Sequence, residues 1–184
     1  MTSALISPAL ISTVETPIGP VTVVAADTDD STVLASGWTA DIAELLVAIS
    51  PSLRPILTKR VGHIEGITDA VLAYHEGDFD GIRTVAVQQN SGVFRQHAWQ
   101  ILRAVPAGQP VSYTELAALS GRPPAIRAAA SACARNAAAL FVPCHRVLRS
   151  DGGLGGFRWG TPAKRWLLAH ESADDRGRTT SPRR

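Results

Sequence analysis

The sequence predicts an α/β N-terminal domain, a small sheet with helices, in residues 1–90, and a mainly α C-terminal domain containing a helix-turn-helix in residues 91–172. Short β-branched runs mix with helical patterns before residue 90, whereas helical patterns dominate after it. The polar stretch QQNSG at 88–92 separates the two. The charge also changes sign there, because residues 1–91 carry 4 Lys or Arg against 11 Asp or Glu, and residues 92–172 carry 10 against 3.

The elements of the N-terminal part are short. β-branched residues on both sides of a Pro-Ile-Gly-Pro turn are typical of paired strands. Apolar residues at helical spacing predict helices that end at Ser-Pro or at Gly. These patterns place two strands within 11–25, further strands at 32–38 and 84–87, and helices at 41–49 and 66–77. No recognisable chemical motif occurs in this part, and its histidines lack a second ligand at metal spacing.

The C-terminal part begins with an amphipathic helix at 93–105. Ser112 caps the next helix, and Glu115, three residues on, completes a capping box. A tight turn at 121–123 leads into a second helix, in which Pro124 suits the first turn. Helix, short turn and helix predict the helix-turn-helix. The remaining expectations are a range of 124–136 for that second helix, a helix at 164–170, and a polar, disordered tail at 173–184.

Composition narrows the class of protein. Two cysteines without a CxxC pair form no disulfide framework, which favours a reduced, intracellular protein. The stretch MTSALISPALISTV lacks a basic region and is broken by Pro8, and no apolar run approaches the roughly 20 residues of a membrane span. We therefore expect a soluble, cytoplasmic protein without a membrane partner. The positive charge of the C-terminal half suggests that it binds a polyanion such as nucleic acid. Two solvated surfaces of different composition would produce the same charge asymmetry.

The stretch FVPCHRVLRS at 141–150 holds Cys144 between a proline and the pair His145-Arg146. The thiolate is the nucleophilic form of cysteine, and nearby cations favour it. Because neighbours on a strand point to opposite faces, Cys144 and His145 can cooperate only in irregular backbone or through a water. Glu171 follows the helix predicted at 164–170 and could return to orient the histidine. A buried structural cysteine is the alternative.

The Gly-rich stretch GGLGG matches neither a dinucleotide fingerprint nor a P-loop, but glycines let backbone amides approach a flat ligand closely. A zinc site is conceivable, but its spacing fits no standard arrangement, so no metal is expected. Its ligands would be Cys133, Cys144, His145 and His170.

The helix at 124–136 is mostly alanine, with Arg127 and Arg135 as its only charges. Small side chains let a helix backbone approach a surface closely, and an early arginine can reach into a groove. A helix that reads bases would carry more Asn, Gln or Arg, so sequence-independent DNA binding is the better prediction. The alternative is that alanine is simply a good helix former packed against a neighbour.

Several motifs in register resemble those of one family. PCHRV at 143–147, with Asn136 before it and the Gly-rich loop, Lys164 and LLAHE at 167–171 after it, resembles the alkylguanine-DNA alkyltransferases, also called methylated-DNA–protein-cysteine methyltransferases. VSYTELAALSGRPPAIRAA resembles their helix-turn-helix, and TPIGPVTVVA more weakly resembles their opening strands. The resemblance implies DNA repair by direct reversal. The protein would be a monomer without a cofactor, acting once on double-stranded DNA that contains O6-alkylguanine.

The resemblance also implies roles for the matching residues. Cys144 would accept the alkyl group from O6 of guanine, with O4 of thymine as a second candidate, and keep it as a thioether. His145 would draw the thiol proton through a water, and Glu171 would hold His145 in position. Asn136 would brace the turn that carries the active-site backbone. Tyr113 would donate toward N3 of the departing guanine, where negative charge develops.

On the DNA side, the resemblance implies that Arg127 fills the gap left by the flipped-out base, while its helix enters the minor groove. The carbonyls of Cys144 and Val147 would accept from the guanine amino group, and amides around Arg158 would face its O6. The remaining implied DNA contacts are Ser112, Thr114, Ala128 and Arg135, and the remaining pocket residues are Phe157, Cys133 and Lys164. Phe157 stands where the family often has tyrosine, which bears on the shape of the pocket.

Two other functions fit part of the pattern. A cysteine hydrolase using Cys144, His145 and Glu171 would turn over and ignore DNA, but it leaves the helix-turn-helix unexplained. A non-catalytic sensor of alkylated DNA would bind the duplex unchanged, but it has no need of a nucleophile.

Overall fold

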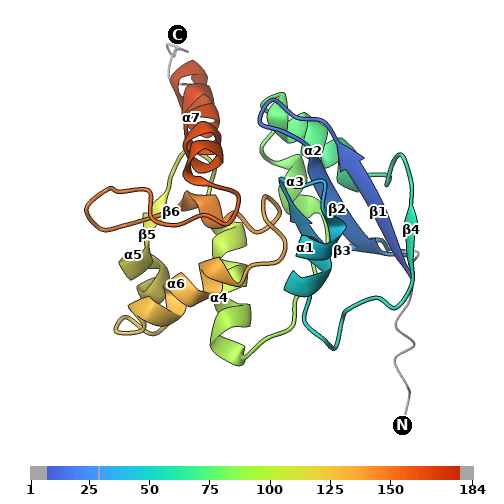
Figure 1. The fold of residues 1–184 in the computed structure, drawn as a ribbon. Coiled ribbons are helices and arrows are strands. Elements are labelled where there is room, and N and C mark those ends of the chain that lie inside the picture. Colours follow the sequence, from blue (N-terminus) through green and yellow to red (C-terminus); the bar gives the residue numbers. More distant parts are fainter. Residues whose placement is uncertain (1–7, 29, 179–184) are drawn as a thin grey trace. The chain divides into compact units, whose positions relative to one another are not determined.

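The computed structural model describes residues 8–28 and 30–178, and the chain divides into two compact units (Figure 1). The first unit comprises the residues up to Gly92 together with Asn136–Phe141. The second comprises Val93–Arg135 and the residues from Val142 onward. The division after Gly92 lies two residues beyond the boundary expected from the sequence. The local sequence pattern does not indicate that 136–141 belongs to the first unit.

The first unit is built on a four-stranded sheet in the order β3-β2-β1-β4. β1 (Ala9–Val14) and β2 (Val21–Ala26) form an antiparallel hairpin, which confirms the two strands expected within 11–25. β3 (Thr32–Gly37) pairs antiparallel with β2, as expected for 32–38. β4 (Thr58–Arg60) pairs parallel with β1 and is not predicted, since three exposed residues carry no alternation of apolar and polar side chains.

The outer edge of β3 is covered by two short segments from later in the chain. Val33 forms a parallel bridge with Val87, and Ser36 forms one with Ala138. These bridges satisfy backbone groups that an edge strand would otherwise expose. The strand expected at 84–87 is therefore wrong: its first residue ends the short helix α3 (Gly81–Thr84), and the remainder makes the single bridge of Val87 with Val33.

Besides α3, the described part of the first unit contains α1 and α2, which confirm the predictions at 41–49 and 66–77. α1 (Ile42–Ala48) packs on β2 and β3, and the Asp41 side chain caps it by accepting from the Ala43 N–H at 2.9 Å. α2 (Ile67–His75) packs on β1, and its buried residues include Val71 and Tyr74.

The second unit is mainly helical. α4 packs on α5 and α6, and the Trp99 indole N–H donates to the Ala132 carbonyl at 2.9 Å. A two-stranded parallel ladder, which the sequence does not predict, joins β5 to β6. The elements are α4 (Val93–Ala104), β5 (Val111–Ser112), α5 (Tyr113–Leu119), α6 (Ile126–Ala134), the 3₁₀ turn η1 (Cys144–Arg146), β6 (Val147–Leu148) and α7 (Thr161–Arg178).

The capping box predicted for α5 is present. The Ser112 hydroxyl accepts from the Glu115 N–H at 3.1 Å, and the Glu115 carboxylate accepts from the Ser112 N–H at 2.6 Å. The start expected for the next helix is wrong, because α6 begins at Ile126. Pro124 lies in the preceding turn, where the Ala125 N–H donates to the Arg122 carbonyl at 2.8 Å.

α7 (Thr161–Arg178) is longer than the helix predicted at 164–170, so Glu171 lies within the helix rather than after it. The helix continues through 173–178, which the sequence assigns to a disordered tail, since an established helix extends at little cost per residue. Residues 179–184 of that tail lie outside the described residues. Among the residues that the structure describes, no helix has both the length and the apolar character to cross a membrane.

Candidate active site

Cys144 opens the 3₁₀ turn η1, and the backbone around it is irregular. The Cys144 N–H donates to the Val142 carbonyl at 2.8 Å, and the Arg146 N–H donates to the Pro143 carbonyl at 3.0 Å. Pro143 has no N–H to offer a regular helix or ladder, which favours this local turn. Such irregular backbone is the condition under which Cys144 and His145 can cooperate. The side chain of Cys144 is largely shielded from solvent, since the residue is only 8% exposed.

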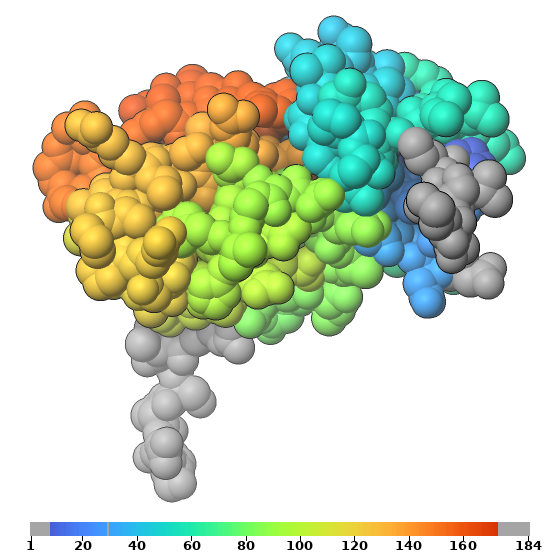
Figure 2. All heavy atoms as spheres, turned by 90° about the horizontal axis from the view of Figure 1, so that it is seen from below, coloured from blue at the N-terminus to red at the C-terminus, as the bar shows by residue number. Residues whose placement is uncertain are grey.

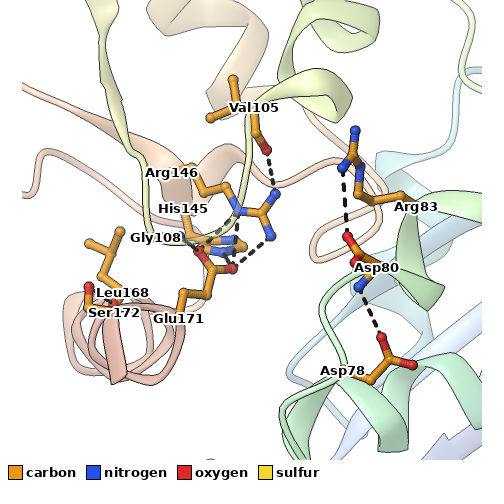
Figure 3. A network of polar contacts seen from close by, with 10 residues as sticks. All are labelled: Asp78, Asp80, Arg83, Val105, Gly108, His145, Arg146, Leu168, Glu171 and Ser172. Carbon is orange, nitrogen blue, oxygen red and sulfur yellow. Dashed lines mark hydrogen bonds and ion pairs between the residues drawn. The ribbon is translucent and has the colours of Figure 1, made fainter. Parts of the chain in front are cut away.

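His145 and Arg146, the two residues after Cys144, belong to a buried network of charged groups (Figure 3). His145 Nε2 lies 2.8 Å from Glu171 Oε1. The Arg146 guanidinium donates to both oxygens of the same carboxylate, from Nε at 3.1 and 3.0 Å and from Nη2 at 2.9 Å. Its Nη1 donates to the Val105 carbonyl at 2.6 Å, and the Gly108 N–H donates to Glu171 Oε2 at 3.4 Å. The structure thus joins His145 and Glu171, as predicted.

Burial and the charges in this network together determine the protonation state of His145. Burial alone would raise the pKa of Glu171, but the contacts with His145 and Arg146 outweigh it and hold that pKa well below its usual range. Glu171 is therefore an anionic acceptor, and His145 Nε2 carries the hydrogen. Burial lowers the pKa of His145 against the opposing effect of Glu171. The result is a neutral imidazole whose Nδ1 is the nitrogen that can take a proton from the thiol.

The helix α7 supplies Glu171 and Lys164 from one face, because positions seven residues apart are two turns apart on a helix. Lys164 is fully buried, and its Nζ donates to the Val147 carbonyl at 2.6 Å and to the Gly156 carbonyl at 3.5 Å. Burial lowers the pKa of Lys164. The Val147 carbonyl, which the resemblance assigns to guanine, thus already accepts from Lys164 in this structure.

Tyr113 begins α5 and faces the Gly-rich loop. Gly155 has a φ of 66°, and a Cβ atom on it would lie 2.9 Å from the Tyr113 hydroxyl, so glycine is required for this approach. Burial, followed by the charges of Cys133 and Cys144, raises the pKa of Tyr113 to about 12. The phenol therefore stays protonated and can donate. Burial also raises the pKa of Cys133, which keeps it a thiol and a poor nucleophile.

The residues expected at DNA lie on or beside α5 and α6, with Ser112 and Arg135 as caps of these helices. Figure 2 shows the chain around α6, in gold, beside α4, in yellow-green. Arg127 and Arg135 are exposed and Ala128 is half-buried. Thr114 is exposed, and its hydroxyl lies 3.1 Å from that of Ser150. The hydroxyl of Ser112, by contrast, already serves as a helix cap.

The remaining predicted residues are placed as follows. Phe157 makes an edge-on ring contact with His145, with centroids 6.5 Å apart. Arg158 is exposed, and its Nη2 donates to the Ala134 carbonyl at 3.4 Å. Asn136 belongs to the first unit, where its Oδ1 accepts from Gln89 Nε2 at 2.9 Å and from the Ala138 N–H at 3.1 Å. Its expected bracing role at the active-site turn stays a prediction.

Sequence reasoning treats Arg146 as a positive charge beside the thiol, whereas the structure shows it buried and paired with Glu171. An arginine set among apolar residues in FVPCHRVL is the signal for such burial, because a buried charge needs a partner. The bond from Arg146 to the Val105 carbonyl could not be predicted from the sequence either, because every residue has a backbone carbonyl. Across residues 8–28 and 30–178, no three His, Cys, Asp or Glu side chains gather in a group that could hold a metal.

The chain is similar to known proteins that act on methylated DNA. Residues 93–173 match the family described as 6-O-methylguanine DNA methyltransferase, DNA binding domain. The chain is 47% identical over 92 residues to the bifunctional transcriptional activator/DNA repair enzyme Ada of Escherichia coli, a match covering 50% of this chain and 26% of that protein. It is 41% identical over 106 residues to a methylated-DNA–protein-cysteine methyltransferase of Salmonella typhimurium, covering 58% and 62%. These matches thus span less than two thirds of either relative.

Solved structures extend the likeness to nearly the whole chain. The crystal structure of the O6-methylguanine methyltransferase of Mycobacterium tuberculosis has a TM-score of 0.71 and 30% identity, over 90% of this chain and 93% of that one. A second structure from that organism, in complex with DNA, has a TM-score of 0.71 and 28% identity over 89% and 93%. With its buried Cys144 turn and His145–Glu171 pair, this chain belongs to the O6-methylguanine-DNA methyltransferase family.

Proposed function

We propose that the protein is a methylated-DNA–protein-cysteine methyltransferase that repairs DNA by direct reversal. Cys144 takes a methyl or other alkyl group from O6 of guanine in duplex DNA, with O4 of thymine as a second candidate substrate. The observation that carries the proposal is the buried His145–Glu171–Arg146 network next to Cys144. It supplies a neutral base, held in one tautomer, for a thiol that must lose its proton.

The transfer is a single in-line displacement. The Cys144 thiol loses its proton through a bridging water to Nδ1 of His145, and the sulfur attacks the alkyl carbon. A carbon–sulfur bond forms as the carbon–O6 bond breaks, and its electron pair leaves with the guanine, which ends with the proton on its ring. Tyr113, protonated because its pKa is raised to about 12, donates toward the developing negative charge. The transfer of the alkyl group and of the proton is complete without a cofactor.

Access to the lesion requires base flipping, because O6 cannot be reached by an attacking sulfur inside the stacked duplex. The helices α5 and α6 are proposed to act as a helix-turn-helix, with the exposed Arg127 filling the gap left by the flipped base. The half-buried Ala128 and its alanine neighbours suit close approach to a minor groove without base reading. The exposed Arg135 adds a phosphate contact.

The product is a thioether, which has no ready leaving group, so each molecule acts once. A monomer contains all the residues that this scheme uses. The cytoplasm is the expected compartment, since the thiol must stay reduced.

The test is intact mass measured after incubation with a duplex that carries one O6-methylguanine. The wild type is expected to gain one methyl group per molecule and then stop, with the adduct on the peptide that contains Cys144. Cys144→Ser should gain nothing. Cys133→Ser is the matched control, because Cys133 is the second cysteine and is not assigned the transfer; it should be methylated like the wild type.

Other outcomes would favour the rival functions. Continued release of product without an adduct would indicate an enzyme that turns over, such as a cysteine hydrolase. Binding of the alkylated duplex with no change in mass would indicate a sensor, in which Cys144 has a structural role.

A further inference from the structure

The segment Asn136–Phe141 belongs to the first unit, although it immediately precedes the active-site turn in the chain. Only Val142 and Pro143 separate its end from Cys144. Residues of the first unit that fix this segment therefore fix the backbone from which the chain enters the turn. The contacts within the first unit show which residues these are.

Ser36, near the end of β3, binds the segment three times. Its N–H donates to the Ala137 carbonyl at 2.9 Å, and its carbonyl accepts from the Ala139 N–H at 3.2 Å. Its hydroxyl donates to the Ala139 carbonyl at 2.6 Å. Ser36 is completely buried, so no water competes for this hydroxyl. The side-chain bond is the one that mutation can remove without touching the ladder.

Gln89 binds the start of the same segment with both ends of its amide. Its Nε2 donates to Asn136 Oδ1 at 2.9 Å, and its Oε1 accepts from the Ala137 N–H at 2.8 Å. Asn136 Oδ1 also accepts from the Ala138 N–H at 3.1 Å, which closes a local turn. Gln89 thus holds a side chain and the backbone beside it in one arrangement.

The end of the segment is strained. Leu140 has a φ of 74° and is the one residue other than glycine with a positive φ in the part of the chain that the structure describes. A leucine reaches this left-handed conformation only when its surroundings impose it. Leu140 is also buried, at 2% exposure. Loss of the bonds that impose this conformation would let the backbone relax four residues before Cys144.

We propose that Ser36 and Gln89 are positioning residues for Cys144, which hold 136–141 in the one conformation from which the chain enters the active-site turn. This inference rests on the proposed alkyl transfer. It gives the first unit a part in the reaction that involves no contact with the substrate. A displacement of about 1 Å at a reacting group can cost on the order of a hundredfold in rate.

The experiment compares matched variants under single-turnover conditions with saturating O6-methylguanine duplex. Ser36→Ala is paired with Ser12→Ala, because Ser12 is a buried serine of the same sheet whose hydroxyl donates to the Gly62 carbonyl at 3.1 Å. Gln89→Ala is paired with Gln88→Ala, an exposed neighbour. Each variant is assayed for transfer rate, for the Kd of the duplex and for Tm, at a temperature well below the lowest Tm.

We expect Ser36→Ala and Gln89→Ala to lower the transfer rate by roughly ten- to a hundredfold while the Kd changes less than about twofold. Ser12→Ala should lower the Tm as much as Ser36→Ala but keep the wild-type rate. Ser36→Thr, which keeps the hydroxyl, should recover the rate. Equal rates for the two serine variants, or a loss that appears only in the Kd, would overturn the inference.

The rate at which iodoacetamide alkylates Cys144 gives a second readout that needs no DNA. If the positioning is real, this rate changes in Ser36→Ala and not in Ser12→Ala. An unchanged rate in both would overturn the inference. A wild type that forms no methyl adduct would refute the proposed function but leave this comparison intact.

Discussion

Replacement of Gly155 by alanine should impair transfer much more than it impairs folding. Gly155 has a φ of 66°, where an L-residue costs about 1–2 kcal/mol. Alanine leaves the unfolded chain fewer conformations than glycine does, which offsets about 0.4–1 kcal/mol of this cost. The new Cβ would lie 2.9 Å from the Tyr113 hydroxyl and 3.2 Å from its Cε2. Since contacts of this kind settle near 3.5 Å or more, the phenol must move by about half an ångström.

Half an ångström at a group that donates to the leaving base corresponds to roughly a tenfold loss of rate. The loop supplies two controls. Gly152 also has a positive φ, of 81°, but no atom within 4 Å of its Cβ position, so Gly152→Ala measures strain alone. Gly156 has neither feature, so Gly156→Ala should behave like the wild type.

The assay is the single-turnover methylation rate at saturating duplex, with thermal denaturation measured beside it. Gly152→Ala and Gly155→Ala should lose similar stability, and only Gly155→Ala should lose about tenfold in rate. A wild-type rate in Gly155→Ala would refute the reasoning, as would an equal loss in Gly152→Ala.

Three further predictions concern the buried groups. Glu171→Gln leaves Arg146 buried without its counter-ion and should lower the free energy of unfolding by about 3–5 kcal/mol in urea denaturation; a loss below 1 kcal/mol would contradict the pairing. Because the pKa of His145 is lowered in the folded state, the unfolded chain binds its proton first, so stability should fall as the pH drops below about 6.5, by at most about 1.4 kcal/mol per pH unit from this group. His145→Asn should lack this part of the dependence of the free energy of unfolding on pH. The same pH dependence in His145→Asn and the wild type would contradict the prediction. Cys133→Ala should keep the methylation rate within about threefold, because the raised pKa of Cys133 leaves it unreactive; a large loss in the same single-turnover assay would show that Cys133 takes part.

Much of the fold can be predicted from local pattern. The hairpin of β1 and β2, the helices α1 and α2, and the Ser112 capping box all depend on residues close in sequence. Local signals fail where a segment depends on a distant partner. Residues 84–87 have strand-forming side chains, yet Thr84 ends α3 and the rest make a single bridge with β3.

For the site, the sequence by itself determined the chemical groups: a thiol at Cys144, a base at His145 and a carboxylate at Glu171. Only the tertiary structure decided their states. It buries His145, which lowers the pKa of that imidazole, and it pairs Arg146 with Glu171. It also brings Ser36 to the segment that precedes Cys144. The physical reason is that protonation and position depend on burial and on partners far away in the chain, and neither appears in the spacing of residues.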